Sequence, residues 1–261
     1  MFAKTKTAIS GSFIGRFVAC CKDKYKKEVE LRLTSGYIAP VSRCLLLPTR
    51  IITAFWCWLQ LGRVTLVNSK IGLCKERLIY CPNHSSYFDA IVMHSITMGP
   101  VHYMSAVEEL RGLFGLKALF LTALGAFAVD RSKGRTVIAP AVDTLVSGKQ
   151  LLMFPEGKIH ISGKFGPFKP GAAVIAGRAC EHLEAGTRVG IVPVHISYGK
   201  RDVETGSTYS FFKMGFSWRG GVKVFFGEPI WVNENHGLSA DEIMEKVRQG
   251  MLKFPSETSG E

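Results

Sequence analysis

From residue 63 onward, short runs of apolar and β-branched residues alternate with stretches of helical periodicity. The runs predict strands at 63–68, 77–82, 101–105, 126–130, 150–154, 189–196 and 222–227. The intervening stretches predict helices at 86–98, 112–124, 134–148 and 170–184, with a polar closing helix at 239–253. This order is typical of an α/β protein with a single mixed sheet flanked by helices, and it argues against a helical bundle or a β-sandwich.

The length and composition favour one globular domain with an N-terminal appendage. The chain has 261 residues, of which 47% are hydrophobic, and this is enough to form a sizeable core. We expect a basic and apolar N-terminal segment over 1–62, a globular domain over 63–254 and a loose tail over 255–261.

Positive charge is concentrated in the first part of the chain. Lys and Arg total 33 against 21 Asp and Glu, which gives a net charge of +12. Residues 1–62 hold ten of these bases and three of the acids, so they carry +7. This charge suits an anionic partner. The body has no interleaved basic and aromatic platform, so we expect a membrane surface and no nucleic acid as the partner.

Two N-terminal stretches predict contact with a membrane. Residues 1–22 contain four bases, no acid and an apolar cluster at 13–18, which is typical of a basic amphipathic helix lying on a membrane or of an organelle transit peptide. Between Cys44 and Gly62 the only charge is Arg50. Trp56 and Trp58 favour an interfacial helix there, and the alternative is an ordinary helix packed on the body.

The cysteines indicate a reducing compartment. There are seven of them, an odd number without Cys-x-x-Cys spacing, so neither a disulfide framework nor a structural zinc site is expected. We therefore expect a membrane-associated protein whose active site faces the cytoplasm or the interior of an organelle.

A histidine and an aspartate follow the second predicted strand. Pro82 ends this strand and a helix begins near Ser86, so His84 lies in a strand-to-helix connection, where α/β folds place ligands. Asp89 is one helical turn away and is able to accept the Nδ1 proton of His84, which leaves Nε2 as a general base. Alternatively, Ser86 and Asp89 form a shortened capping box and Asp89 only caps the helix.

Three further motifs also lie on predicted strands: the first two end a strand, and the third is expected to break one with proline. Together the four motifs are specific. They are Gly125-Ala126-Phe127-Ala128-Val129-Asp130-Arg131, Phe154-Pro155-Glu156-Gly157 and Ile191-Val192-Pro193-Val194. With Asn83-His84 through Asp89, which matches an NHx4D motif, they resemble the glycerolipid acyltransferase family, most closely its lysophosphatidic acid acyltransferase branch. The resemblance covers residues 64–229 and implies a glycerol-3-phosphate acyltransferase-like fold.

The resemblance implies roles for individual residues. His84 would be the general base and Asp89 its orienter, and Arg131 would bind the phosphate of the acceptor. Glu156 would position the acceptor glycerol, with Asn83, Gly157 and Lys158 also at the substrate. Backbone N–H groups at the start of the following helix are expected to stabilise the oxyanion. As alternatives, Arg131 forms a salt bridge with Asp130, and Glu156 is an exposed turn residue.

The implied reaction uses no metal and no cofactor. A fatty acyl group moves from acyl-CoA or acyl carrier protein to the free hydroxyl of a membrane lipid such as lysophosphatidic acid, which gives phosphatidic acid. Without its catalytic function, the same fold would be a lipid-binding or scaffold protein. No Gly-x-Ser-x-Gly nucleophile elbow and no complete nucleotide-binding loop occurs, so neither a serine hydrolase nor a nucleotide-binding enzyme is expected.

The chain departs from the family pattern at two positively charged positions. Lys158-Ile159-His160 stands where the family has Thr-Arg-Ser, and Ala106-Val107-Glu108-Glu109-Leu110 stands where it has Ala-Lys-x-Glu-Leu. Either Lys158, Lys164 or Lys169 supplies the missing charge, or the acceptor is a different lipid.

Overall fold

The computed structural model describes residues 13–70, 76–86, 88–97, 99–130, 132, 136–160, 165–199, 220–235 and 237–254. The strands are β1 (Val64–Val67), β2 (Arg77–Pro82), β3 (Val101–Ala106), β4 (Ala126–Val129), β5 (Gln150–Leu152), β6 (Val189–Tyr198), β7 (Val222–Phe226) and β8 (Ile230–Trp231). The α-helices are α2 (Phe13–Leu33), α3 (Arg43–Leu61), α4 (Phe88–Ile96), α5 (Val107–Leu110), α6 (Leu116–Ala123), α7 (Ile138–Val146), α8 (Gly171–Glu181) and α9 (Ala240–Leu252). The described residues also include the short 3-10 helices η2 (Leu113–Gly115) and η4 (Val232–Glu234).

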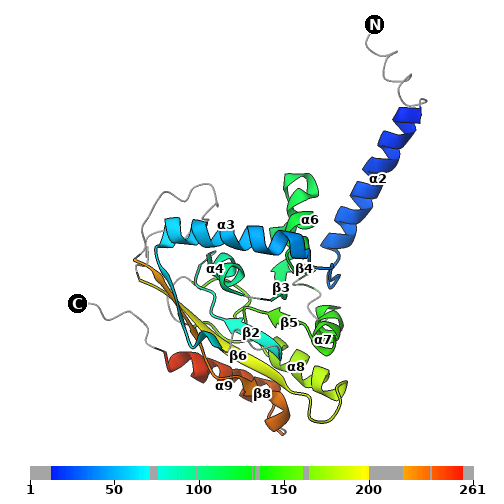
Figure 1. Cartoon of the computed structure of the whole chain (residues 1–261). Helices are drawn as coiled ribbons and strands as arrows, with labels where there is room; N and C mark the ends of the chain where they lie inside the picture. Colours follow the sequence, from blue (N-terminus) through cyan, green and yellow to red (C-terminus); the bar gives the residue numbers. More distant parts are fainter. Residues whose placement is uncertain are drawn as a thin grey trace.

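The strands form one mixed sheet in the order β1-β7-β6-β2-β5-β3-β4, with β8 paired to β6 (Figure 1). Strands β6, β2, β5, β3 and β4 run parallel, whereas β7 and β8 are antiparallel to β6. The predicted fold class is therefore confirmed. Because the carboxyl ends of the parallel strands share one edge, the connections that follow β2, β4 and β5 lie along that edge.

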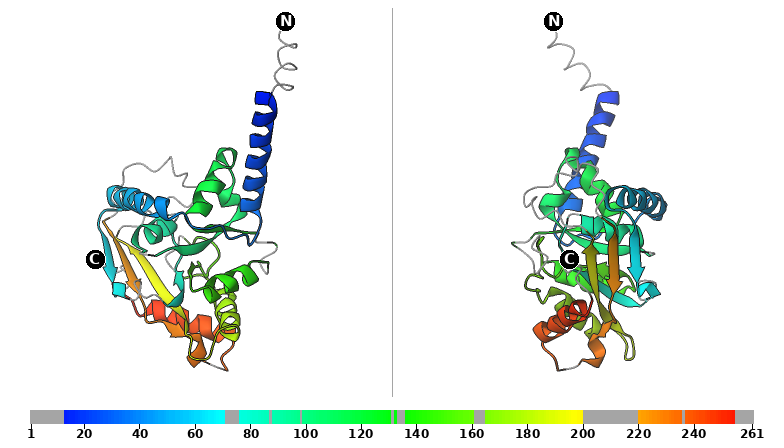
Figure 2. Two further views of the ribbon diagram at one scale, coloured as in Figure 1. Left: turned by 45° about the vertical axis from the view of Figure 1, so that its right-hand side comes forward. Right: turned by 90° about the vertical axis from the view of Figure 1, so that its left-hand side faces the viewer.

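Helices cover both faces of the sheet (Figure 2). Leu78 and Tyr80 of β2 point into a core shared with α3 and α4. Ile79 and Cys81 point into a second core shared with α7, α8 and α9. All four of these side chains are at most 1% exposed. Central parallel strands buried on both faces require apolar side chains at successive positions, which explains the continuous apolar runs in the sequence.

The seven predicted strands and the helices near 86–98, 170–184 and 239–253 are present with small shifts at their ends. The helix predicted at 112–124 is divided into η2 and α6, because residues 112–115 all have positive φ angles. The helix predicted at 134–148 is represented by α7, and part of its first turn lies outside the described residues. Strand β8 and helix α5 were not predicted, because two and four residues are too few to show a periodicity.

Helix α2 extends away from the body, and its C-terminal end packs near β4 and α6 (Figure 1). Arg32 Nη1 donates to Thr122 Oγ1 at 2.9 Å, and Leu33 packs against the core cluster beside α6. The helix predicted within 1–22 is present from residue 13 and continues to residue 33. Residues 1–12 and the predicted tail at 255–261 lie outside the described residues, so the transit-peptide alternative and the tail stay predictions.

Helix α3 has two different faces. Cys57 and Leu61 are fully buried in the core shared with β2 and α4. The opposite face is an exposed apolar stripe, formed by Leu47, Ile51, Phe55 and Trp58. Within the described part of the chain, α3 alone is long and apolar enough to cross a membrane, and 28% of its apolar window is buried. The buried face fits the predicted helix packed on the body, whereas an interfacial position of the exposed face stays a prediction. Because α3 packs in the core shared with β2 and α4, it is part of the globular body, which was predicted to begin at residue 63.

Candidate active site

Asn83 fixes the connection between β2 and α4 to the neighbouring strand. Its Nδ2 donates to the Ile196 carbonyl at 3.2 Å, and the Ile196 N–H donates to its Oδ1 at 2.7 Å. The side chain is 3% exposed. Both ends of the amide therefore bind the backbone of β6 and hold the next residue, His84, in place. The predicted contact between Asn83 and the substrate stays a prediction.

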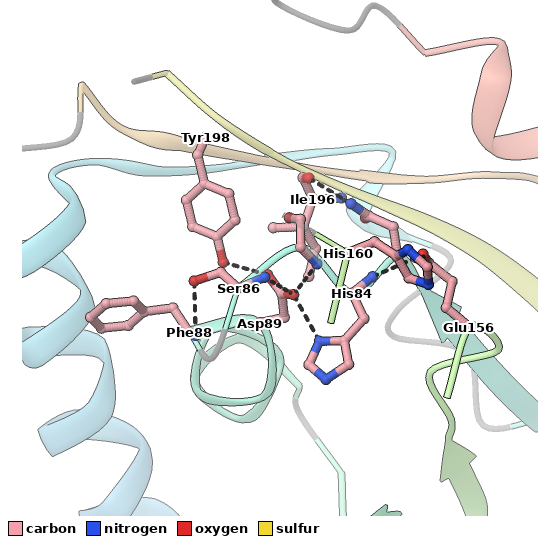
Figure 3. Close-up of polar contacts among 10 residues, drawn as sticks. His84, Ser86, Phe88, Asp89, Glu156, His160, Ile196 and Tyr198 are labelled. Atoms are coloured by element: carbon pink, nitrogen blue, oxygen red, sulfur yellow. Dashed lines mark hydrogen bonds and ion pairs between the residues drawn. The ribbon is translucent and has the colours of Figure 1, made fainter. Parts of the chain in front are cut away.

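His84 and Asp89 form a hydrogen-bonded pair, as the motif predicts. His84 Nδ1 lies 3.0 Å from Asp89 Oδ2, and the carboxylate is completely buried (Figure 3). An ionised carboxylate is only an acceptor, so Nδ1 carries the proton and Nε2 is the acceptor. The ring stacks on Phe154 with a centroid distance of 4.0 Å. The imidazole side chain is 19% exposed, and its second nitrogen points away from Asp89 (Figure 3).

Asp89 also organises the backbone at the start of α4. Its Oδ2 accepts from the N–H groups of Ser85 and Ser86 at 2.7 and 2.8 Å. Ser86 Oγ accepts in turn from the Phe88 N–H at 3.2 Å. The two interpretations of Asp89 are therefore compatible, because one buried carboxylate caps the helix start and orients the imidazole.

The expected oxyanion donors at this helix start do not include the amides of Ser85, Ser86, Phe88 and Asp89, which all have hydrogen-bond partners within the chain. Ser85 and Ser86 donate their N–H groups to Asp89, Phe88 donates to Ser86 Oγ, and Asp89 donates to the Ser86 carbonyl. An oxyanion donor must be free to bind the transition state. These four amides already have partners, and those of Ser85 and Ser86 hold the carboxylate that pairs with His84.

Glu156 is buried and joins two loops, so the alternative that it is an exposed turn residue is wrong. It is 4% exposed. Its Oε1 accepts from the His84 N–H at 2.8 Å, and its Oε2 accepts from the Gly166 N–H at 2.8 Å. The His160 N–H donates to the His84 carbonyl at 2.7 Å. The turn after β5 thus supports His84 on both sides of its backbone, whereas a contact between Glu156 and the acceptor glycerol stays a prediction.

A lysine lies over the turn that contains Glu156. Gly157 adopts a φ of +69°, and a Cβ built there would lie 2.7 Å from Lys169 Nζ. The Lys169 N–H donates to the Pro155 carbonyl at 2.9 Å, which fixes its backbone beside the turn. Lys158 is exposed. Of the three lysines proposed to replace the missing charge, Lys169 and Lys158 are therefore near the turn.

Arg131 and Lys164 lie outside the described residues, so the proposed phosphate contact of Arg131 and its alternative salt bridge with Asp130 both stay predictions. Asp130 Oδ1 accepts from the N–H and the hydroxyl of Ser132 at 2.9 and 2.6 Å.

Tyr198, at the end of β6, is a part of the site that sequence reasoning missed. Its hydroxyl donates to Asp89 Oδ1 at 2.5 Å. Burial, followed by the nearby Asp89 charge, raises the pKa of Tyr198 well above its ordinary value, so the hydroxyl stays protonated. Strand alternation places Tyr198 on the same face as Val192, Val194 and Ile196, and this was a signal available in the sequence.

Two other histidines are unsuited to proton transfer at neutral pH. Burial, followed by the charge of Arg50, lowers the pKa of His94 to about 4. Burial, followed by the charge of Lys149, lowers the pKa of His102 to about 4. Both imidazoles are therefore neutral. His84 Nδ1 lies 3.0 Å from the buried Asp89 carboxylate, whereas His160 Nε2 lies 3.7 Å from the buried Glu156 carboxylate, so His84 has the shorter contact.

Comparison with known proteins adds independent information. A family model described as Acyltransferase matches residues 63–197. The chain is 25% identical over 178 residues to the chloroplastic 1-acyl-sn-glycerol-3-phosphate acyltransferase BAT2 of Brassica napus, covering 66% of this chain and 46% of that protein. It is 25% identical over 175 residues to the chloroplastic 1-acyl-sn-glycerol-3-phosphate acyltransferase LPAT1 of Arabidopsis thaliana, covering 65% of this chain and 42% of that protein. The chain thus spans less than half the length of these relatives.

The fold is also similar to a solved structure. The crystal structure of the 1-acyl-sn-glycerophosphate (LPA) acyltransferase PlsC from Thermotoga maritima superposes with a TM-score of 0.56 at 20% sequence identity. The match covers 82% of this chain and 81% of the other.

Proposed function

The chain belongs to the Acyltransferase family, and we propose that it transfers a fatty acyl group to the free hydroxyl of lysophosphatidic acid or a related lysophospholipid. The product with lysophosphatidic acid is phosphatidic acid, an intermediate of phospholipid synthesis. One observation carries the proposal: His84, paired with the buried Asp89, lies at the carboxyl edge of the sheet with its Nε2 available. The printed activity of the two plant relatives supports the choice of acceptor.

The proposed mechanism is direct acyl transfer. His84 Nε2 removes the proton from the acceptor hydroxyl while the hydroxyl oxygen attacks the thioester carbonyl of acyl-CoA or of an acylated acyl carrier protein. The carbonyl re-forms, the thiolate leaves, and the new ester is released. Asp89 stabilises the imidazolium that His84 becomes, and the proton then passes to the thiolate. A positioned general base of this kind contributes about 10² to 10⁴ in rate. The step uses neither a metal nor an organic cofactor.

We assign the acceptor phosphate to the basic side chains around the turn after β5. Lys169 is the strongest described candidate, because its ammonium lies over Gly157, next to the Glu156 that supports His84. Lys158 is exposed on the same turn, and Arg131, a further candidate, comes two residues after β4 in the sequence. A lysine binds phosphate as a mobile point charge, so these residues compensate for the arginine that Ile159 replaces. The loss of that arginine favours a second candidate, a different lysophospholipid as acceptor.

We also propose that one end of the molecule rests on a membrane. The apolar stripe of α3 and the tip formed by η2 and α6 lie at the same end, opposite α9 (Figures 1 and 2). At this tip Leu113 and Phe114 are 69% and 97% exposed. Exposed apolar groups of this size are typical of a lipid-binding surface. The basic α2, whose Tyr25 donates to the Phe114 carbonyl, extends from the same end and suits anionic headgroups.

Acyl transfer is tested by incubating the purified full chain with labelled oleoyl-CoA and vesicles that contain lysophosphatidic acid. We expect labelled phosphatidic acid, formed at least about 10² times more slowly when His84→Ala replaces the wild type. A panel of other lysophospholipids, assayed in the same way, identifies the preferred acceptor. If the folded wild type acylates no acceptor with either thioester yet binds the vesicles, the lipid-binding scaffold replaces the enzyme.

Membrane contact is tested by flotation with anionic vesicles. The double variant Ile51→Ser and Phe55→Ser removes two exposed apolar side chains, each worth about 1.5–3 kcal/mol if fully buried in lipid. We therefore expect vesicle binding to fall at least tenfold. The control is Leu252→Ser on α9, which is 51% exposed at the opposite end and should leave flotation unchanged. Equal flotation of all three proteins would contradict the proposed face.

A further inference from the structure

We propose that Tyr198 is a positioning residue for the catalytic pair and acts on the reaction through Asp89. This inference rests on the proposed function of His84 and Asp89. It goes beyond the four motifs, because Tyr198 follows the last of them and touches neither the imidazole nor the turn of Glu156 in any contact described. The hydroxyl of Tyr198 and the carboxylate of Asp89 lie 2.5 Å apart, in a region closed to solvent.

The two oxygens of Asp89 have different tasks. Oδ2 accepts from His84 Nδ1 and from the N–H groups of Ser85 and Ser86, so it serves the imidazole and the helix start. Oδ1 accepts from Tyr198. A completely buried carboxylate requires hydrogen bonds to both oxygens, because an unsatisfied charged group in a protein interior is strongly unfavourable. Tyr198 therefore fixes the rotation of the carboxylate about its own bond, and with it the direction of the hydrogen bond to His84.

The position of Tyr198 is itself well determined. Tyr198 pairs with Val222 of β7 in the antiparallel sheet. The next residue, Gly199, donates its N–H to the Gly221 carbonyl at 3.0 Å. The ring is 6% exposed and packs in the core shared by α3, α4 and β6. The phenol thus reaches Asp89 from a rigid strand rather than from a loop, and its protonated hydroxyl is held as a donor (Figure 3).

The consequence for catalysis is a specific kinetic effect. Removing the hydroxyl leaves the ring in place but frees Oδ1, so the carboxylate gains rotational freedom and His84 is oriented less well. Small losses of orientation reduce the rate of the chemical step without reducing the binding of substrates. We expect Tyr198→Phe to lower kcat about tenfold while KM for the acceptor and for acyl-CoA stays within about twofold.

The matched control is Tyr80→Phe. Tyr80 is 1% exposed in the same core, and its hydroxyl lies 3.5 Å from Gln150 Oε1, away from the catalytic pair. Both variants remove one buried hydroxyl, so a general loss of packing affects them alike. We expect wild-type kcat for Tyr80→Phe. If both variants retain wild-type kcat, or both lose it equally, the positioning role is overturned.

A double-mutant comparison tests whether Tyr198 acts through Asp89. In the Asp89→Asn background, Tyr198→Phe should change kcat by less than about twofold, because the charge that it orients is already absent. A tenfold loss in both backgrounds would show independent roles and overturn the inference.

Thermal unfolding of the wild type, Tyr198→Phe, Asp89→Asn and the double variant separates this inference from the proposed reaction. The decrease in Tm caused by Tyr198→Phe should be clearly smaller in the Asp89→Asn background, whatever reaction the protein catalyses. Equal decreases would contradict the coupling. Absence of acyl transfer in the wild type would instead reject the proposed function.

Discussion

The two halves of the candidate site are built in different ways. On the side of the general base, buried Asp89 accepts four hydrogen bonds, from His84, Ser85, Ser86 and Tyr198. On the side assigned to the acceptor phosphate, the charges are the exposed Lys158 and Lys169. The first half is held by backbone amides and a rigid strand, whereas the second half depends on flexible side chains.

This difference bears on the proposed function, in which a firmly held general base is combined with an acceptor site of altered charge. Catalysis by a general base depends on orientation, which a buried and fully bonded network provides. Recognition of a phosphate by lysine depends mainly on charge and tolerates displacement. The missing arginine at Ile159 therefore affects the choice of acceptor more than the reaction.

The largest effect is expected from breaking the rigid half with Asp89→Asn. In this variant the new side-chain amide points an N–H group at one of the donors that bind the wild-type carboxylate. The uncharged amide also does not stabilise the imidazolium. We expect kcat to fall by about 10³ to 10⁴, with KM little changed. Steady-state kinetics with circular dichroism as a folding check measures this. A folded variant with more than a tenth of the wild-type kcat would show that His84 does not depend on Asp89.

Glu156→Gln tests the connection between the two halves. The carboxylate accepts the N–H groups of His84 and Gly166 while almost completely buried, and the glutamine amide satisfies only one of them. We expect the free energy of unfolding to decrease by about 2–3 kcal/mol and kcat to fall as well. Urea unfolding measures the change. Glu245→Gln, at an exposed position on α9, is the control. Equal unfolding curves for the two variants would contradict the stabilising role of the buried Glu156 carboxylate.

The folded protein, which positions both halves of the site, should become less stable in acid because of His102. Burial lowers the pKa of this imidazole to about 4, so between pH 6.5 and 4 the folded state binds fewer protons than the unfolded state. Stability is therefore complete above pH 6.5 and decreases as the pH falls toward 4, by about 2 kcal/mol from this group at pH 5. His102→Gln should make the dependence on pH shallower, and the exposed His182→Gln should not. Parallel pH profiles for both variants would contradict this assignment.

The smallest effect is expected on the flexible half, from Lys169→Met. Loss of one mobile charge should raise KM for lysophosphatidic acid about five- to tenfold and leave kcat and KM for acyl-CoA nearly unchanged. Lys149→Met, an exposed lysine beyond the opposite end of β5, is the matched control. If kcat falls rather than KM rising, Lys169 belongs to the rigid half and the distinction between the halves is lost.

Much of the fold follows from local sequence signals. The strands β2, β5 and β6 are apolar at successive positions because they are buried on both faces. Pro82 and the Phe154-Pro155-Glu156-Gly157 turn mark the ends of β2 and β5. Other features were hidden because they depend on neighbours distant in the chain. The break between η2 and α6 requires positive φ at Leu113 and Phe114, which neither residue type predicts.

The same distinction applies to the site. His84 and Asp89 were predictable from a short motif because they are five residues apart, and Glu156 from its own motif. Tyr198 is separated from Asp89 by 109 residues and meets it only because β6 pairs with β2. The amides at a helix start attract any anion, and here Asp89 itself accepts from those of Ser85 and Ser86, so the oxyanion prediction fails for these two groups.

The most direct test of the central claim is the rate of acyl transfer catalysed by His84→Ala, measured with labelled oleoyl-CoA and lysophosphatidic acid against the wild type. Because Nε2 is assigned as the proton acceptor, we expect kcat to fall by at least about 10² while the variant remains folded and still floats with vesicles. A folded His84→Ala protein that forms phosphatidic acid at the wild-type rate would contradict the assignment of His84 as the general base.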